Sequence, residues 1–361
     1  MFSARQIEET IPQDVVDIYS DMEMDMLLAC AAFSVAIEGM DYAAKMYALN
    51  ELQAELQAIV SKYWTGTQKE LANTMRNSLL KSMAATEVTY IAGVTAGKLL
   101  PAVAVSDSLI MRRIIDNAIK ETILRFSKVN TTAVNVTIST LQEAFLMNLG
   151  GRMALQQAVV SAVEDMAASG ITAATFPSGR SIQMASFVRM VIRTSTANTA
   201  RELAFARAQE YGVDLIQVSA HAGARPLCEP FQGRIFSLSG KTEKYPPFSS
   251  TSYGEVAGLF GINCGHFFDP FIEGVDRQPT AEEIDPAGAG SDKGNAQMYR
   301  ESQMQRYNER MIRSWKRRAE VSKVQTGDNT FELHKVREWQ ARQRSFLAQA
   351  DRTRRYYREA I

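Results

Sequence analysis

Apolar residues recur at spacings of three and four along the first 170 residues, which is the pattern of one buried face of an α-helix. One such stripe comprises Leu49, Leu52, Leu56, Ile59 and Tyr63. A new helix is expected to begin at Thr67, because Thr67-x-x-Glu70 has the form of a capping box. Such stripes must be buried against one another, so residues 1–170 are predicted to form a large helical region.

The pattern changes after Gly170. Residues 171–184 alternate β-branched and other residues around a Pro-Ser-Gly turn, which predicts a β-hairpin. A helix over 187–211 should end at Gly212, and three strands are expected at 213–219, 234–238 and 263–268. The predicted fold class is therefore α+β. It comprises the N-terminal helical region, a small α+β domain over 171–275 with a hairpin and a few strands, and a helical tail.

The last part of the chain is basic. Residues 276–294 are rich in Pro, Gly, Ala and Asp, which predicts an exposed linker, and residues 295–361 predict two helices at 295–323 and 331–358. The net charge is zero, but from residue 293 onward about 17 Lys and Arg face about 8 Asp and Glu, so the tail carries roughly +9. The candidate nucleic-acid-binding residues are Arg310, Arg313, Lys316, Arg317 and Arg318. Two interpretations stay open: the tail binds DNA phosphates, or it docks on an acidic protein surface such as the chain's own acidic N-terminal segment.

Cysteine and histidine are scarce and clustered. The chain has three of each, and His221, Cys228, Cys264 and His266 lie within about 46 residues. If 263–268 is a strand, Cys264 and His266 point to the same face. Two thiolates and two imidazoles are the ligand set of a closed structural zinc site. The alternatives are buried thiols beside hydrogen-bonded histidines, and a catalytic Cys–His pair.

Several classes of protein are disfavoured. Three cysteines without a disulfide pattern fit a reducing compartment, and the N-terminus has no signal-peptide pattern. The most apolar window, residues 88–105, is interrupted by Lys98 and Pro101, so no membrane span is expected. The sequence has no phosphate loop, dinucleotide fingerprint, nucleophile elbow or zinc-protease helix. We therefore do not expect a free-standing metabolic enzyme.

The Cys/His segment resembles the C-terminal signature of the phage minor capsid protein 2 family of tailed phages and prophages. The resemblance is carried by His221-Ala-Gly-Ala-Arg-Pro226, by Phe231-Gln-Gly-Arg-Ile-Phe-Ser-Leu-Ser-Gly240 and by Gly261-Ile-Asn-Cys-Gly-His-Phe-Phe-Asp-Pro-Phe271. It extends over about residues 10–285. Two positions depart from the family pattern: Cys228 stands where histidine is frequent, and Gly265 stands where arginine is usual. The first exchange keeps a zinc ligand; the second puts any role of that arginine in doubt.

The resemblance implies a structural component of the virion, made in the host bacterial cytoplasm. It is similar in role to the Mu F-like head-morphogenesis proteins. Its expected partners are the portal and head proteins, with the helical region serving assembly near the portal vertex in head assembly or in DNA packaging or ejection. Phage DNA is a further partner if the basic tail binds it. The alternative is a metal-dependent or Cys–His enzyme domain within residues 171–275 of a phage structural protein.

Overall fold

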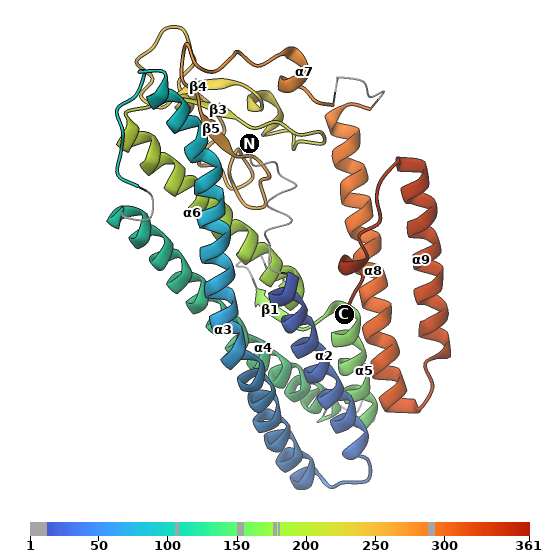
Figure 1. The fold of residues 1–361 in the computed structure, drawn as a ribbon. Helices are drawn as coiled ribbons and strands as arrows, with labels where there is room; N and C mark the ends of the chain where they lie inside the picture. Colours follow the sequence, from blue (N-terminus) through green and yellow to red (C-terminus); the bar gives the residue numbers. More distant parts are fainter. Residues whose placement is uncertain (1–12, 105–107, 150–154, 176–178, 180, 288–292) are drawn as a thin grey trace. The chain divides into compact units, whose positions relative to one another are not determined.

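A computed structural model describes residues 13–104, 108–149, 155–175, 179, 181–287 and 293–361. Most of these residues are helical, and the strands form two small sheets (Figure 1). The helices are α2 (Gln13–Ala36), α3 (Tyr42–Thr95), α4 (Leu109–Leu149), α5 (Leu155–Ser169), α6 (Met184–Tyr211), α7 (Ala281–Ile284), α8 (Asn295–Thr326) and α9 (Thr330–Ala350). The strands are β1 (Thr172–Thr175), β2 (Ser181–Gln183), β3 (Leu215–Val218), β4 (Ile235–Ser237) and β5 (Phe268–Pro270), and the short 3-10 helices are η1 (Glu229–Phe231), η2 (Phe248–Ser250) and η3 (Tyr356–Arg358).

The chain forms two compact units, and each is assembled from separated segments. Of the described residues, those within 71–123 and 190–302 form the first unit, and those within 13–70, 124–189 and 303–361 form the second. The divisions fall inside α3, α4, α6 and α8. The sequence-based scheme of a helical region, an α+β domain, a linker and a tail in succession therefore differs from the units that the contacts define.

The first unit holds a three-stranded antiparallel sheet with β3 in the centre and the order β4-β3-β5. Ile216 and Val218 of β3 enter a core that also contains Cys228, Cys264 and Phe268. A second cluster joins α3 to α6, where the rings of Tyr90 and Tyr211 stack with centroids 4.4 Å apart. Apolar residues from these elements thus hold the sheet against two helices.

The second unit packs α2 against the later part of α4 and against α5. The rings of Tyr19 and Phe126 lie 5.2 Å apart, and those of Phe33 and Phe145 lie 6.3 Å apart. Helices α8 and α9 lie side by side (Figure 1), joined by a hydrogen bond from Asn308 to the Gln343 side-chain oxygen. The hairpin of β1 and β2 belongs to this unit, and its two strands pair antiparallel.

Several elements predicted from turn residues and from helix-end residues are present in the structure. The hairpin, the helix ending before Gly212 and the strands at 213–219 and 234–238 are confirmed. Gly212 adopts φ +66°, the left-handed conformation expected at a helix C-terminus. The first tail helix is confirmed, but the second ends at Ala350, where Asp351 turns to φ +50°.

Two local predictions are wrong. No helix begins at Thr67, because α3 runs unbroken for 54 residues and the Thr67 hydroxyl donates to the carbonyl of Tyr63. The strand predicted at 263–268 begins only at Phe268, since Asn263 turns with φ +56°. Within residues 276–294, predicted as an exposed linker, the short helix α7 begins with a full capping box of Thr280 and Glu283.

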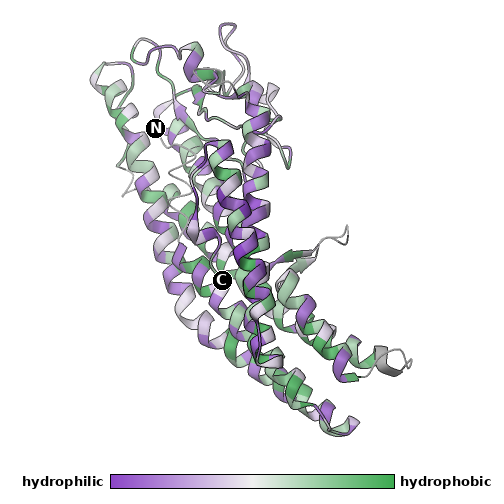
Figure 2. Ribbon diagram, turned by 90° about the vertical axis from the view of Figure 1, so that its right-hand side faces the viewer, coloured by the Kyte–Doolittle hydropathy of each residue, from purple (hydrophilic) through white to green (hydrophobic). Residues whose placement is uncertain are grey.

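Among the described helices, none is long and apolar enough to cross a membrane. Figure 2 shows hydrophobic and hydrophilic residues mixed along the long helices. This agrees with helices that bury one side within each unit.

Candidate functional site

The Cys/His cluster lies beside the C-terminal end of β3 in the first unit. The chain leaves β3 through Ser219, whose backbone N–H donates to Phe267 O at 2.8 Å, while Phe267 N–H donates to the Ser219 hydroxyl at 2.9 Å. On the other side, Gly233 N–H donates to Val218 O at 2.9 Å. The loop containing Cys228 and the segment that precedes β5 are therefore both fastened to the same strand end.

Three of the four predicted ligands converge. The Sγ atoms of Cys228 and Cys264 are 3.9 Å apart, and Cys264 Sγ lies 3.4 Å from His266 Nδ1. Donor atoms of these three residues all lie within 4.8 Å of one another. Cys264 and His266 do so from an extended loop and not from a strand.

His221, the fourth predicted ligand, lies outside that group of donor atoms but beside it. Its ring stacks on the ring of His266, with centroids 4.3 Å apart. Its Nδ1 lies 3.2 Å from the carbonyl of Ala222, whereas its Nε2 is buried with no hydrogen-bond partner among the described residues. The imidazole thus has one free nitrogen directed into the protein.

Gln232 organises both histidines, and the sequence analysis did not select it as a site residue. Its side-chain oxygen lies 3.2 Å from His266 Nε2 and accepts a hydrogen bond from the backbone N–H of His221 at 3.2 Å. Because this oxygen can only accept, the proton of His266 must sit on Nε2, which leaves the lone pair of Nδ1 facing Cys264. The feature of the sequence that could have identified Gln232 is its position in the segment 231–234, between the pair His221 and Cys228 and the pair Cys264 and His266.

The pKa values of the two cysteine thiols are shifted in opposite directions. The hydrogen bond with Cys228 and the proximity of His266 hold the pKa of the Cys264 thiol well below its usual value, although burial opposes this. The same hydrogen bond and burial raise the pKa of the Cys228 thiol. Burial and the neighbouring His266 lower the pKa of His221 to about 4, so its ring is neutral at pH 7.

Cys264 contacts His266, and His266 contacts Gln232. These three residues therefore also have the arrangement of a nucleophile, a base and a group that orients the base. However, Cys264 and His266 are only 3% and 1% exposed. A substrate could not reach either group without opening the core. The geometry therefore favours metal binding, or a purely structural role, over nucleophilic catalysis.

The basic tail residues are divided between surface and interior. Arg310 is exposed, and Lys316 and Arg318 are half-buried. Arg313 and Arg317 are buried: Arg313 donates to the carbonyl of Arg358, and Arg317 donates to Ala167 O at 2.9 Å. These two arginines hold parts of the second unit together and do not reach the surface. Three exposed arginines of α9 were not selected from the sequence: Arg337, Arg342 and Arg344.

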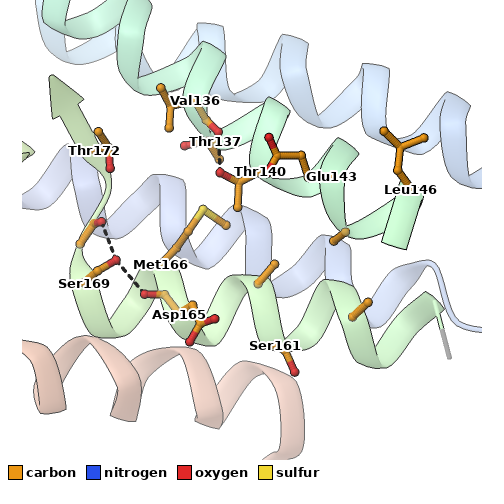
Figure 3. Close-up of a pocket in the computed structure, with 14 residues that line it drawn as sticks. Val136, Thr137, Thr140, Glu143, Leu146, Ser161, Asp165, Met166, Ser169 and Thr172 are labelled. Carbon is orange, nitrogen blue, oxygen red and sulfur yellow. Dashed lines mark hydrogen bonds between the residues drawn. The ribbon is translucent and has the colours of Figure 1, made fainter. Parts of the chain in front are cut away.

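The second unit also contains a groove of about 880 Å³ between α4 and α5 (Figure 3). Val136, Thr140 and Glu143 of α4 face Asp165 and Met166 of α5 across it. The described lining residues include no Cys, His, Lys or Arg.

Comparison with known proteins gives matches of two kinds. The sequence model of the phage minor capsid protein 2 family matches residues 4–348. A protein of Lactococcus phage LL-H named "Structural protein" is 27% identical over 258 residues, which cover 68% of this chain and 67% of that protein. A protein of Lactococcus phage mv4 with the same name is 35% identical over 124 residues, which cover 33% of this chain and 93% of that protein. No solved structure matches the chain.

A mainly helical chain that matches a capsid family over nearly its whole length is a structural protein of a phage particle. The chain belongs to the phage minor capsid protein 2 family. The resemblance carried by the Cys/His segment is thereby confirmed.

Proposed function

We propose that this protein acts near the portal vertex of a tailed phage, in head assembly or in DNA packaging or ejection. It would be made in the host cytoplasm and incorporated into the virion beside the portal and head proteins. Support comes from its family and from one structural observation: large apolar side chains are exposed at the end of α3, at the start of α4 and in the segment between them. Proteins that bind other proteins expose such surfaces, whereas isolated soluble proteins seldom do.

These side chains, here called the apolar α3–α4 surface, belong to the first unit, and four of the six lie in the most apolar window of the sequence, residues 88–105. The residues of this surface are between 56% and 83% exposed: Val88, Ile91, Leu100, Val103, Leu109 and Ile110. Burial of one such side chain contributes roughly 1.5–3 kcal/mol. A partner that covers several of them would gain enough free energy to bind stably.

Replacing Val88, Leu100 and Leu109 together with glutamate is expected to weaken binding to the purified portal assembly of the same phage by about a hundredfold or more, because each change places a charge at an apolar contact. Binding would be measured by surface plasmon resonance, with circular dichroism to confirm that the variant folds. The control replaces Val324 and Leu333 with glutamate in the same way; these side chains are 42% and 38% exposed on α8 and α9. Equal affinity of the triple variant and the natural chain would refute this assignment of the surface.

A second role, contact with DNA, is favoured by the exposed arginines of the tail. Arg310 on α8 and Arg337, Arg342 and Arg344 on α9 extend into solvent. Exposed arginines bind phosphate through charge and release of counterions, without reading sequence. The buried Arg313 and Arg317 support the other interpretation for their part of the tail, which docks within the second unit.

If the tail binds DNA, changing these four exposed arginines to glutamine is expected to weaken binding and to flatten its salt dependence by roughly 0.9 in the log–log slope for each lost contact. Fluorescence anisotropy at several salt concentrations would measure this, with two unrelated DNA sequences. The control changes four exposed cations elsewhere: Lys69, Lys81, Arg113 and Lys120. Absence of binding at low salt, or binding insensitive to salt, would redirect the tail to a protein partner.

A further inference from the structure

We propose that His221, Cys228, Cys264 and His266 bind one Zn²⁺ ion as a closed structural site in the first unit. The chemical class of the ligand is a borderline-soft divalent cation, because two thiolates and two imidazoles prefer such ions over magnesium or calcium. This property is separate from the role in the phage head.

Two distances among the proposed ligands are close to those of a tetrahedral site. With bonds of about 2.3 Å to sulfur and 2.0–2.1 Å to nitrogen, two ligand atoms of a zinc tetrahedron lie roughly 3.3–3.8 Å apart. The two Sγ atoms are separated by 3.9 Å, and Cys264 Sγ and His266 Nδ1 by 3.4 Å. These two edges thus agree with the expected edges to about 0.2 Å, and they are also the lengths of hydrogen bonds between the same groups.

The orientation of His266 is that of a metal ligand. Gln232 accepts the hydrogen bond from Nε2, so the Nδ1 lone pair faces Cys264. A lone pair and a sulfur atom at this distance need a cation between them, either a proton or a metal ion. Metal-bound histidines usually donate their second N–H to a fixed acceptor, which is the role that Gln232 fills here.

His221 supplies the fourth ligand. Its Nε2 is buried and has no partner among the described residues, and its ring already lies against His266. Leaving a buried polar nitrogen unpaired costs about 1–3 kcal/mol, and a bond to the metal would remove that cost. Reorientation of this ring toward the two sulfur atoms completes the tetrahedron and leaves no position for water.

The metal would join two loops that have no covalent link. His221 and Cys228 follow β3, whereas Cys264 and His266 precede β5. Binding of Zn²⁺ releases two protons to solvent, that of the Cys228 thiol and the one held between Cys264 Sγ and His266 Nδ1. The ion then acts as a cross-link at the end of the sheet and stabilises the first unit without catalysing a reaction.

The test uses the full chain, prepared without metal and then titrated with Zn²⁺ or Co²⁺ alone. We expect one ion per chain by elemental mass spectrometry, and for Co²⁺ the intense thiolate charge-transfer and tetrahedral ligand-field absorption bands. The absorption bands report the ligand set of the natural chain, so this arm does not depend on the folding of any variant.

The variants have matched controls in the chain itself. Cys228→Ser and Cys264→Ser should lose the ion, whereas Cys30→Ser, which changes the buried cysteine of α2, should keep it. His221→Gln and His266→Gln should weaken binding by at least about a hundredfold, whereas the exposed His334→Gln should not. Gln232→Leu should keep one ion per chain but bind it about 10–100-fold more weakly, as loss of an outer hydrogen bond does.

Three results would overturn the proposal. The first is absence of stoichiometric zinc together with absence of cobalt absorption bands. The second is equal binding by the natural chain and the two cysteine variants. The third is a Cys228–Cys264 disulfide in protein purified under reducing conditions. Full binding by His221→Gln would overturn the closed four-ligand site and leave a three-ligand site open to water.

Discussion

Replacement of Arg207 by methionine is expected to destabilise the first unit by about 2–3 kcal/mol, because it removes a buried cation that donates hydrogen bonds to two carboxylates and a backbone carbonyl. Arg207 is fully buried on α6 and pairs with Glu87 of α3, donating to it from Nε at 2.9 Å and also from Nη2. It donates as well to Val103 O at 2.8 Å and to Glu210 at 2.5 Å. One side chain therefore joins α6, α3 and the segment between α3 and α4.

The measurement must report on this unit alone. All three tryptophans, Trp64, Trp315 and Trp339, belong to the second unit, so hydrogen exchange of the peptides covering α6 and residues 71–95 is the appropriate method. Arg207→Lys should recover part of the loss, since it keeps the charge but not the planar fork. Glu202→Gln, an exposed change on the same helix, should alter stability by less than about 0.5 kcal/mol. Unchanged exchange in Arg207→Met would contradict the prediction.

Replacement of Glu23 by alanine is expected to destabilise the second unit by about 3 kcal/mol or more. Glu23 is 3% exposed on α2 and accepts a hydrogen bond from the backbone N–H of Ile171 at 2.7 Å. Burial raises the pKa of this carboxyl, and the nearby charge of Arg317 partly offsets the rise. Removal of the carboxylate leaves Arg317 buried without its counter-charge and the Ile171 N–H without an acceptor.

Urea unfolding followed by tryptophan fluorescence reports on this unit. A double-mutant cycle with Arg317→Met measures the interaction free energy between Glu23 and Arg317 apart from their other contacts. The double variant should be more stable than the sum of the two single changes predicts. Asp21→Ala, an exposed change on the same helix, serves as the control. Additive effects within about 0.3 kcal/mol would show that the two charges do not interact.

Sequence reasoning recovered the elements that depend on neighbouring residues. The hairpin follows from its turn residues, and the end of α6 follows from Gly212. The capping box at Thr67 failed because residues on both sides of it continue one helix, so the hydroxyl bonds back to Tyr63. Thr280 and Glu283 have the same Thr-x-x-Glu spacing, and there it does form the N-terminal cap of a helix. A short capping motif alone cannot distinguish these cases.

Scarcity of Cys and His selected four residues, of which the structure brings together Cys228, Cys264 and His266. Their convergence depends on the pairing of β3 with β5, which the apolar pattern of the strands suggests, but their local geometry was not predicted. The burial of Arg317 could not be predicted, because its acceptor carbonyl at Ala167 lies 150 residues away. Charge composition identifies a basic segment, but only tertiary contacts decide which cations remain in solvent.

The discontinuous second unit has a consequence for biosynthesis. Gln325 of α8 donates to the Ser34 hydroxyl of α2, a contact that spans 291 residues of chain. During translation α2 can therefore pack against α4 and α5 first, but its contacts are complete only when α8 has been made. Contacts between residues so far apart form slowly, and exposed apolar helices aggregate. We expect the nascent chain to depend on host chaperones, and the second unit to mature only after the polypeptide has been released.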